Sequence, residues 1–158
     1  MSPRVVIQEA RDPRDLAAVQ DLFREYVYWL GRTYALDVGY QDFAGEMATF
    51  PLRYESLLLA RVDDAAAGAC GLKRLDATRC ELKRLYVRPA FRGLDLGATL
   101  TTRLMADAHA RGFATMALDT HGALTSAIKL YERLGFTPSA PHNEPGNACT
   151  LFFARPLP

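Results

Sequence analysis

A short segment that combines arginine and glycine lies between a strand-like run and a helix-like run. It reads VRPAFRGLDLGA and spans Val87–Ala98. Backbone amides at a helix N-terminus point outward and the helix dipole favours negative charge, so this arrangement suits a phosphate group. Arg92 adds a charge-assisted contact, and Gly93 and Gly97 allow close backbone approach. We therefore expect the segment from Glu81 to Leu100 to bind a pyrophosphate.

The same segment also has a purely structural interpretation. Asp95 would then be the N-cap of an ordinary surface helix, and Arg88 and Arg92 would be solvated. A second stretch, SAIKLYERLGF at Ser126–Phe136, follows about thirty residues later. The two stretches together argue for the phosphate site more strongly than either does alone.

Together the two stretches resemble the GNAT superfamily of acetyl-CoA-dependent N-acetyltransferases. The acetyl-CoA loop of that family reads Arg/Gln-x-x-Gly-x-Gly/Ala, which corresponds here to Arg92–Gly97. The following helix carries A-x-x-L-Y-x-x-x-G-F, which corresponds to Ala127–Phe136. The order of elements agrees over nearly the whole chain. The resemblance implies an enzyme that uses acetyl-CoA as co-substrate and acetylates an amine.

The resemblance also implies which residues hold acetyl-CoA. Backbone groups of Leu85, Tyr86 and Val87 would bind the pantetheine arm, at the end of a strand that splays from its neighbour. Main-chain amides of the loop and the first helical turn would bind the pyrophosphate. The residues implied for this second part are Arg92, Gly93, Leu94, Asp95, Leu96, Gly97 and Ala98.

The chain departs from the family pattern at two positions. Asp95 replaces the usual glycine, and Leu124 replaces an asparagine that often precedes the second motif. An Asp carboxylate repels phosphate and can cap the amides that the pyrophosphate needs, unless its side chain points to solvent. We expect acetyl-CoA to bind, but more weakly than it would with glycine at this position.

Tyr131 is the first catalytic candidate. By resemblance it occupies the position of a tyrosine whose hydroxyl faces the sulfur of CoA. A phenol is a weaker acid than a thiol, so the expected role is a hydrogen bond that stabilises the departing thiolate. The alternative is a core aromatic, because Ala127, Leu130 and Leu134 share its helix face.

Glu81 is the second catalytic candidate, because a protonated amine must lose a proton before it can attack. Side chains alternate along a strand, so Glu81 is expected to share the face of Lys83, Leu85 and Val87 and to reach a cleft there. The alternative is a strand carboxylate that pairs with Lys83 or Arg79.

Three further side chains are candidates for the acceptor pocket. Trp29 and Tyr34 lie near the end of the first helix, where the resemblance places that pocket, and His142 lies in a long polar loop. Their alternatives are core packing and an ordinary loop. His109, His121 and His142 do not form a metal-binding pattern, so no metal is expected.

The elements that position these residues follow from hydrophobic periodicity. A strand at Arg4–Glu9 is expected before a helix that Asp12 or Asp15 caps and that Gly31 ends after Leu30. The remaining predicted elements are a helix at Asp42–Phe50, strands at Ser56–Val62, Gly68–Leu75 and Arg79–Val87, a helix from Leu96 to Gly112, a strand at Ala114–Thr120, a helix at Leu124–Leu134 and a strand at Cys149–Ala154.

This order of elements predicts an α/β fold of the α+β type, with a mixed sheet covered by helices. By resemblance, the sheet would be mostly antiparallel, with splayed strands that form the acetyl-CoA cleft. A chain of 158 residues is expected to form a single domain over residues 1–158.

Composition limits the classes of partner. The net charge of +1, from 19 basic and 18 acidic residues, lacks the field that a nucleic-acid or membrane binder carries. No run approaches the about 18 apolar residues of a membrane span, and the N-terminus lacks the apolar region of a signal peptide, so a cytoplasmic location is expected. Arginine far outnumbers lysine, which is typical of a GC-rich bacterial genome.

Cysteine usage bears on the mechanism. Cys70, Cys80 and Cys149 form no CxxC pair, so neither a disulfide framework nor zinc is expected, and Cys80 has no evident activating neighbour. We expect direct acetyl transfer to a primary amine of a small molecule, with a strand amide near Val87 polarising the carbonyl. The alternatives are a non-catalytic acyl-CoA sensor or interaction module and a protein N-terminal or lysine acetyltransferase. A homodimer is compatible with the sequence.

Overall fold

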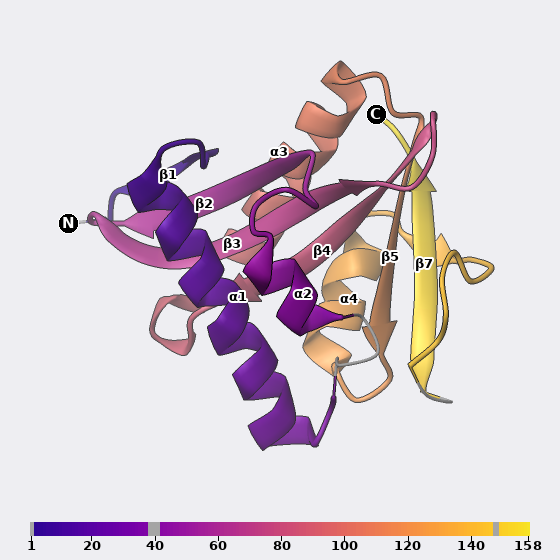
Figure 1. The fold of residues 1–158 in the computed structure, drawn as a ribbon, viewed down its shortest axis with the longest axis horizontal. Helices are drawn as coiled ribbons and strands as arrows, with labels where there is room; N and C mark the ends of the chain where they lie inside the picture. Colours follow the sequence, from indigo (N-terminus) through magenta and orange to yellow (C-terminus); the bar gives the residue numbers. More distant parts are fainter. Residues whose placement is uncertain (1, 38–41, 147–148) are drawn as a thin grey trace.

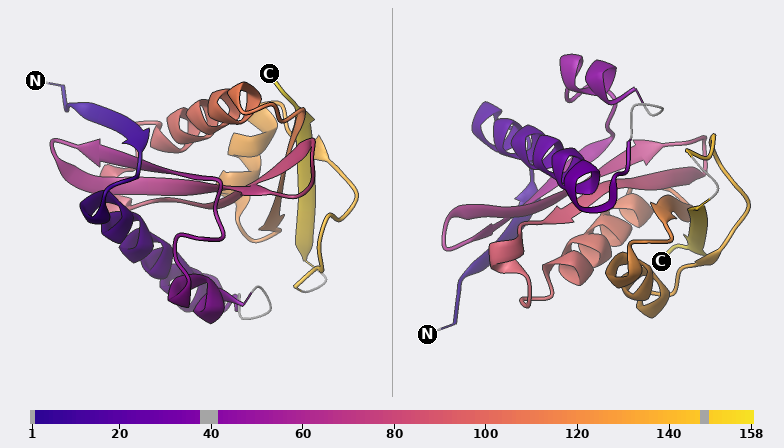
Figure 2. Two further views of the ribbon diagram at one scale, coloured as in Figure 1. Left: turned by 45° about the horizontal axis from the view of Figure 1, so that its top comes forward. Right: turned by 90° about the horizontal axis from the view of Figure 1, so that it is seen from below.

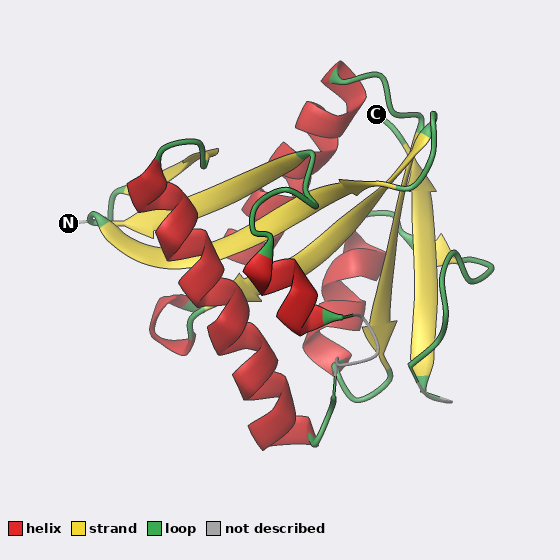
Figure 3. Cartoon of the chain, viewed as in Figure 1, coloured by secondary structure: helices red, strands yellow, loops and turns green. Residues whose placement is uncertain are grey.

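A mixed β-sheet forms the centre of the molecule (Figures 1 and 3). The computed structural model describes residues 2–37, 42–146 and 149–158. Within these residues the sheet has seven strands in the order β1-β2-β3-β4-β5-β7-β6. The elements are β1 Val5–Glu9, α1 Pro13–Tyr34, α2 Phe43–Ala48, β2 Ser56–Val62, β3 Ala65–Arg74, β4 Arg79–Val87, the short 3-10 helix Pro89–Phe91, α3 Leu96–Ala110, β5 Thr115–His121, α4 Thr125–Arg133, β6 Thr137–Pro138 and β7 Thr150–Pro156.

Strands β4 and β5 form the parallel pair of the sheet, and the other neighbours are antiparallel. Their pairing covers only Arg79–Glu81 of β4 against Thr115–Ala117 of β5. Beyond these residues the two strands diverge, as Figure 1 shows. The mixed, mostly antiparallel sheet with a splayed strand pair confirms the predicted fold class.

Helices cover both faces of the sheet. Helices α1 and α2 lie on one face, and α3 and α4 lie on the other (Figure 2). Each face has its own apolar core: Phe23 of α1 packs with Leu59 and Tyr86, whereas Leu104 of α3 packs with Leu82. Strand β4 contributes to both cores and therefore lies between the two layers of helices.

A β-bulge interrupts β4 at Arg84. Gly71 pairs with Lys83 and Ala69 pairs with Tyr86. The two β4 residues between them, Arg84 and Leu85, therefore lie opposite a single residue of β3, Cys70. Arg84 has a φ of 59°, a left-handed conformation that is uncommon outside glycine. An extra residue reverses the alternation of side chains beyond it.

The bulge overturns one expectation from the sequence. Glu81 and Lys83 lie on the face of α1 and α2, whereas Leu85 and Val87 pack into the core under α3 and α4. The prediction that these four side chains share one face was therefore wrong. Regular alternation cannot foresee a bulge.

Several element ends differ from the predicted ones. Helix α1 continues through Gly31 to Tyr34, because Ala35 adopts the left-handed conformation that ends a helix and donates its N–H to the Gly31 carbonyl. Strand β3 begins at Ala65, because Asp63 and Asp64 alone form the turn with φ values of 48° and 71°.

Other differences are small. Helix α2 is shorter than Asp42–Phe50, with Asp42 as its N-cap, and the two-residue strand β6 has no counterpart in the prediction. The described residues include no helix that combines the length and the apolar character needed to cross a bilayer.

Candidate active site

Two adjacent cavities meet at Tyr131. The first, which we call the α4 cavity, has a volume of about 270 Å³ and lies between α1, the end of β4 and α4. The second, the β4–β5 cavity, has a volume of about 80 Å³ and lies between the diverging strands. Both are lined by Tyr26, Leu85, Leu124 and Tyr131. Groups bound in the two cavities would therefore meet at these side chains.

The predicted cofactor residues line the α4 cavity and a neighbouring hollow. Tyr86, Val87 and Arg92 line the α4 cavity together with Leu85. The hollow adjoins it at Gly97 and is lined by Asp95, Gly97, Ala98 and the α4 residues Lys129 and Arg133. The loop thus borders a continuous depression along α4.

The first turn of α3 leaves its amides available to a ligand. Asp95 is the N-cap residue, but its carboxylate caps none of the helix amides. It accepts instead from Arg133 Nη2 at 2.9 Å, and Asp95 has a φ of 59°. Because the first amides of a helix lack acceptors within the helix, they can bind an anion here.

The remaining loop residues have distinct environments. Gly93 has a φ of 95°, which suits glycine. Leu94 is exposed, whereas the Leu96 side chain is buried beside Val62 and Ala67. Leu96 therefore anchors the start of α3 and offers its amide rather than its side chain.

Gly97 and Arg92 shape the α4 cavity. A methyl group on Gly97 would lie 3.1 Å from Leu130 Cδ2, which shows how closely α3 approaches α4. Arg92 donates from Nε to the Val87 carbonyl at 3.1 Å and lies 5.0 Å from the centre of the Trp29 ring. The guanidinium thus lies on the wall of this cavity.

Tyr131 is buried at the junction of the cavities, and its ring packs edge-on against Phe136. Burial raises the pKa of its hydroxyl above the ordinary value. The group therefore stays protonated and can donate a hydrogen bond. The functional and core interpretations of Tyr131 are compatible, because the buried ring also lines both cavities.

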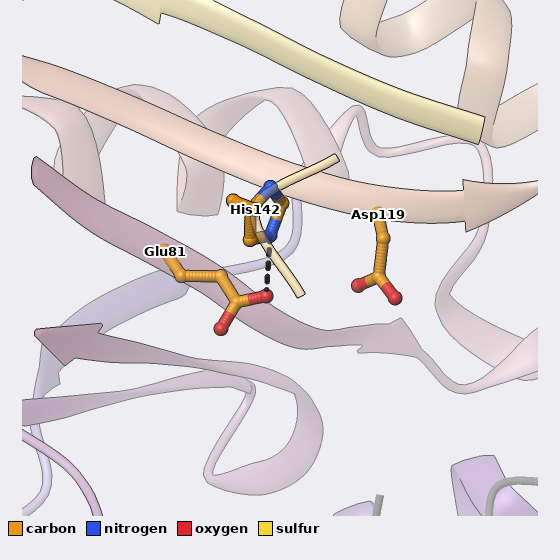
Figure 4. Close-up of side chains that lie close together, drawn as sticks. All are labelled: Glu81, Asp119 and His142. Carbon is orange, nitrogen blue, oxygen red and sulfur yellow. Dashed lines mark hydrogen bonds and ion pairs between the residues drawn. The ribbon is translucent and has the colours of Figure 1, made fainter. Parts of the chain in front are cut away.

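Glu81 and His142, predicted in separate roles, lie in contact (Figure 4). His142 Nε2 lies 2.9 Å from Glu81 Oε2, and Asn143 Nδ2 donates to the same oxygen at 3.2 Å. Burial opposes ionisation of Glu81, but the hydrogen bond from His142 and the charge of Lys83 outweigh it and lower the pKa of the carboxyl. An ionised carboxylate only accepts, so His142 donates.

Neither Glu81 nor His142 is among the described residues that line the two cavities. The His142 side chain is only 2% exposed and packs edge-on against Phe152. Glu81 is instead a buried neighbour of Lys83, whose Nζ lies 3.6 Å from its carboxylate. Glu81 therefore contacts Lys83, a lining residue of the β4–β5 cavity, without lining the cavity itself.

Asp119 on β5 places a carboxylate in the lining of the β4–β5 cavity. Its Oδ1 lies 3.5 Å from Lys83 Nζ. One ligand atom each from Glu81, Asp119 and His142 falls within 4.8 Å of the others, a spacing that could hold a metal ion. The Lys83 ammonium, however, already places a positive charge beside both carboxylates, so this donor set does not fit a cation well.

Arg84 lines the same cavity from the bulge. Its Nε and Nη2 donate to the two carboxylate oxygens of Glu46 at 3.5 and 3.4 Å. Tyr54 donates to Glu46 at 2.6 Å, and Lys73 Nζ lies 3.5 Å away. Burial opposes ionisation of Glu46, but Arg84, Tyr54 and Lys73 together lower its pKa.

Trp29 and Tyr34 line the α4 cavity rather than the β4–β5 cavity. Their rings pack edge-on at 5.3 Å between centres. The structure therefore places both predicted acceptor residues beside Arg92 and Val87, on the side of the predicted cofactor residues.

Sequence reasoning missed Asp119 and Arg84 as cavity residues. One signal was available for each. Asp119 directly follows the apolar run Met116–Leu118 of β5, and Lys83 and Arg84 are adjacent cations in a largely buried strand. Two adjacent cations in such a strand indicate irregular alternation.

The two buried cysteines have no nucleophilic character. Burial raises the pKa of Cys80 to about 12 and raises that of Cys70 as well. Both therefore remain thiols near neutral pH.

Comparison with known proteins identifies the family. The model of the acetyltransferase (GNAT) family matches residues 16–136. An uncharacterized N-acetyltransferase of Schizosaccharomyces pombe is 32% identical, with 87% of this chain and 86% of that protein covered. A protein of Azospirillum brasilense named IAA acetyltransferase is 29% identical, with 98% and 99% covered.

Solved structures share the fold. An acetyltransferase from Streptococcus agalactiae superimposes with a TM-score of 0.78 at 18% identity and covers 97% of this chain and 98% of its own. An acetyltransferase from Salmonella typhimurium, solved with its cofactor acetyl-CoA, has a TM-score of 0.70 at 22% identity and covers 98% and 94%. The chain belongs to the acetyltransferase (GNAT) family and is an acyltransferase of the GNAT type.

Proposed function

We propose that this protein transfers the acetyl group of acetyl-CoA to a primary amine of a small molecule by direct attack. The observation that carries the proposal is the meeting of the two cavities at Tyr131. One cavity continues to main-chain amides suited to phosphate, and the other contains charged side chains suited to an amine. The β4–β5 cavity is small, which favours a small acceptor over a folded protein.

In this proposal the α4 cavity and the adjoining hollow hold acetyl-CoA. Backbone groups of Leu85, Tyr86 and Val87 bind the pantetheine arm, and amides at the start of α3 bind the pyrophosphate. When bound, acetyl-CoA supplies an activated thioester. A main-chain amide on β4 near Val87 polarises its carbonyl.

Tyr131 and Asp119 have complementary roles. The neutral Tyr131 hydroxyl donates a hydrogen bond to the departing thiolate. Asp119 lines the acceptor cavity and accepts the proton of the attacking amine, directly or through water. Glu81, held by His142, positions the Lys83 ammonium beside Asp119 rather than contacting the amine itself.

Calorimetry with acetyl-CoA, followed by a free-thiol assay with a panel of small amines, tests the proposal. We expect binding and amine-dependent release of CoA. Binding without release from any amine would instead support an acyl-CoA sensor. Release that requires a peptide or protein, with acetylation located by mass spectrometry, would support a protein acetyltransferase.

The Asp119→Asn variant tests the assignment of the base. A general base contributes about 100-fold or more to rate, so kcat/KM should fall by about that factor while acetyl-CoA affinity is retained. Asp21→Asn removes a carboxylate that is 70% exposed on α1 and serves as the matched control. Equal activity of the two variants would remove Asp119 from the mechanism.

A further inference from the structure

Charged residues of both signs line the β4–β5 cavity, and their ion-pair partners Glu46 and Glu81 lie behind this lining. On one side, Lys73 and Arg84 both lie within 4 Å of the Glu46 carboxylate, and the described residues place no second carboxylate that close to either cation. On the other side, Lys83 lies within 4 Å of two carboxylates, Glu81 and Asp119, and Glu81 also contacts His142. Among these described side chains the first cluster has two cations and one carboxylate, and the second has one cation and two carboxylates. Asp37, on the loop after α1, adds a further carboxylate to the lining of this cavity.

The bulge is what brings Arg84 into this arrangement. In a regular strand, adjacent side chains point to opposite faces. Because Arg84 adopts a φ of 59°, its side chain reaches Glu46 and Phe43 of α2, and Lys83 and Arg84 are adjacent lining residues of the cavity. Such a conformation in a non-glycine residue is unfavourable and tends to persist at functional sites.

Glu46 does not use all the hydrogen-bond donors of the Arg84 guanidinium. The bonds from Nε and Nη2 to Glu46 are 3.5 and 3.4 Å long, whereas charge-assisted bonds are typically about 2.7–2.9 Å. Glu46 is also shared with Tyr54 and Lys73. The guanidinium has five N–H donors in a planar fork that matches a carboxylate.

We propose that the acceptor is a small zwitterion, an amino acid whose carboxylate binds Arg84 and whose amine faces Asp119. The inference rests on the proposed function and specifies its substrate class. A lining that contains both cations and carboxylates favours a ligand with opposite charges at its two ends and disfavours a plain alkylamine. Leucines also line the cavity, among them Leu30, Leu36 and Leu82, and favour an apolar side chain.

Matched acceptor pairs test this proposal. Each pair consists of an amino acid and the amine left when its carboxylate is removed: L-leucine with 3-methylbutylamine, and L-phenylalanine with 2-phenylethylamine. L-leucinamide keeps the shape of leucine without the negative charge and imitates a peptide N-terminus. CoA release gives kcat/KM for each acceptor with wild-type protein, Arg84→Gln, Arg84→Lys and Arg24→Gln. Arg24 is 55% exposed on α1 and provides the matched arginine control.

The informative quantity is the ratio of kcat/KM for the amino acid to kcat/KM for the matching amine. Comparing this ratio between wild type and variant cancels the different basicity of the two amines, and also any partial loss of folded protein. A charge-assisted hydrogen bond corresponds to about 10- to 100-fold in binding. We expect Arg84→Gln to lower the ratio by that factor, Arg84→Lys to restore part of it, and Arg24→Gln to leave it unchanged.

Two outcomes would overturn the inference, and they are distinguishable. Acetylation of alkylamines or leucinamide as efficiently as leucine, or an unchanged ratio in Arg84→Gln, would reject the zwitterion while leaving the N-acetyltransferase intact. Acetyl-CoA binding without CoA release from any acceptor would reject the proposed function itself and, with it, the acceptor class.

Discussion

The two sides of the proposed active site use different chemical groups. On the cofactor side, the groups are main-chain amides and glycines of one continuous segment, Arg92–Ala98, at the start of α3. On the acceptor side, they are charged side chains from α2, β4 and β5, which include Glu46, Arg84 and Asp119. Most substitutions leave main-chain groups in place, whereas a substitution that leaves a buried charge without its partner lowers the free energy of unfolding. We therefore expect the acceptor side to be the more sensitive of the two.

The largest expected effect is on the acceptor side. Glu46→Gln leaves Arg84 and Lys73 without their shared carboxylate, and breaking a buried ion pair costs about 3–5 kcal/mol. Urea unfolding at pH 7 measures the loss. Glu25→Gln, which removes the 41%-exposed partner of Arg88, should cost at most about 1 kcal/mol. Equal losses in the two variants would contradict the high cost expected for a buried charge on the acceptor side.

The pH dependence of the free energy of unfolding, compared between wild type and Glu46→Gln, sharpens this test. The pKa of Glu46 is lowered in the folded protein from its ordinary value of 4.5. Its ionised form therefore contributes stability above that value, and the contribution is lost as the pH falls through the folded pKa. The stability difference between wild type and Glu46→Gln should therefore shrink as the pH falls below 4.5 and through the lowered pKa of the folded protein.

Tyr131 lies where the two sides meet and gives the next largest effect. Tyr131→Phe should lower kcat by about 100-fold, as expected for loss of a positioned hydrogen-bond donor to the developing charge, with little change in acetyl-CoA affinity. Stopped assays of CoA release and calorimetry separate the two quantities. Tyr28→Phe removes a hydroxyl from a side chain that is 64% exposed and should have no effect. Unchanged turnover in Tyr131→Phe would exclude it from the mechanism.

On the cofactor side, geometry rather than charge is the sensitive property. A methyl group at Gly97 would lie 3.1 Å from Leu130 Cδ2 and would narrow the cavity that both residues line. Overpacking of this kind costs about 1–3 kcal/mol, so Gly97→Ala should weaken acetyl-CoA binding about 10-fold by calorimetry. Gly31→Ala, with its nearest contact at 3.8 Å, is the control. Similar affinities for both variants would argue against a cofactor in this cavity.

The smallest expected effect is at Asp95. Its carboxylate pairs with Arg133 and does not cap α3, so the amides stay available and only charge repulsion remains. Asp95→Gly suits the left-handed backbone and should tighten acetyl-CoA binding about threefold at low salt, with less effect at high salt. Asp95→Asn separates charge from backbone. Unchanged or weaker binding by Asp95→Gly would show that Asp95 does not oppose the pyrophosphate.

The difference between the two sides also explains what the sequence could predict. The cofactor loop is contiguous, and its glycine and helix-start signals are local, so Arg92–Ala98 could be assigned to the start of α3 before the structure. The order of strands and helices followed from periodicity for the same reason. Helix ends were less predictable, because a left-handed cap at Ala35 needs no glycine.

The acceptor side could not be predicted in this way. Glu46 and Arg84 are 38 residues apart, and their contact depends on how α2 packs over β4. The bulge at Arg84 then moved Leu85 away from the face assigned to it. Long-range charge pairs and a reversal of alternation leave no local pattern in a single sequence.

The short parallel pairing between β4 and β5 has an evolutionary consequence. Only Arg79–Glu81 joins the two halves of the sheet through β4, so substitutions on β5, including at Asp119, can remodel the acceptor wall without altering the register of β3 and β4. The β5 wall can then change while β4, which bears Arg84 and leads into the loop before α3, keeps its register. This separation offers a physical reason why one fold persists among acetyltransferases that share only 18–25% of their residues with this chain.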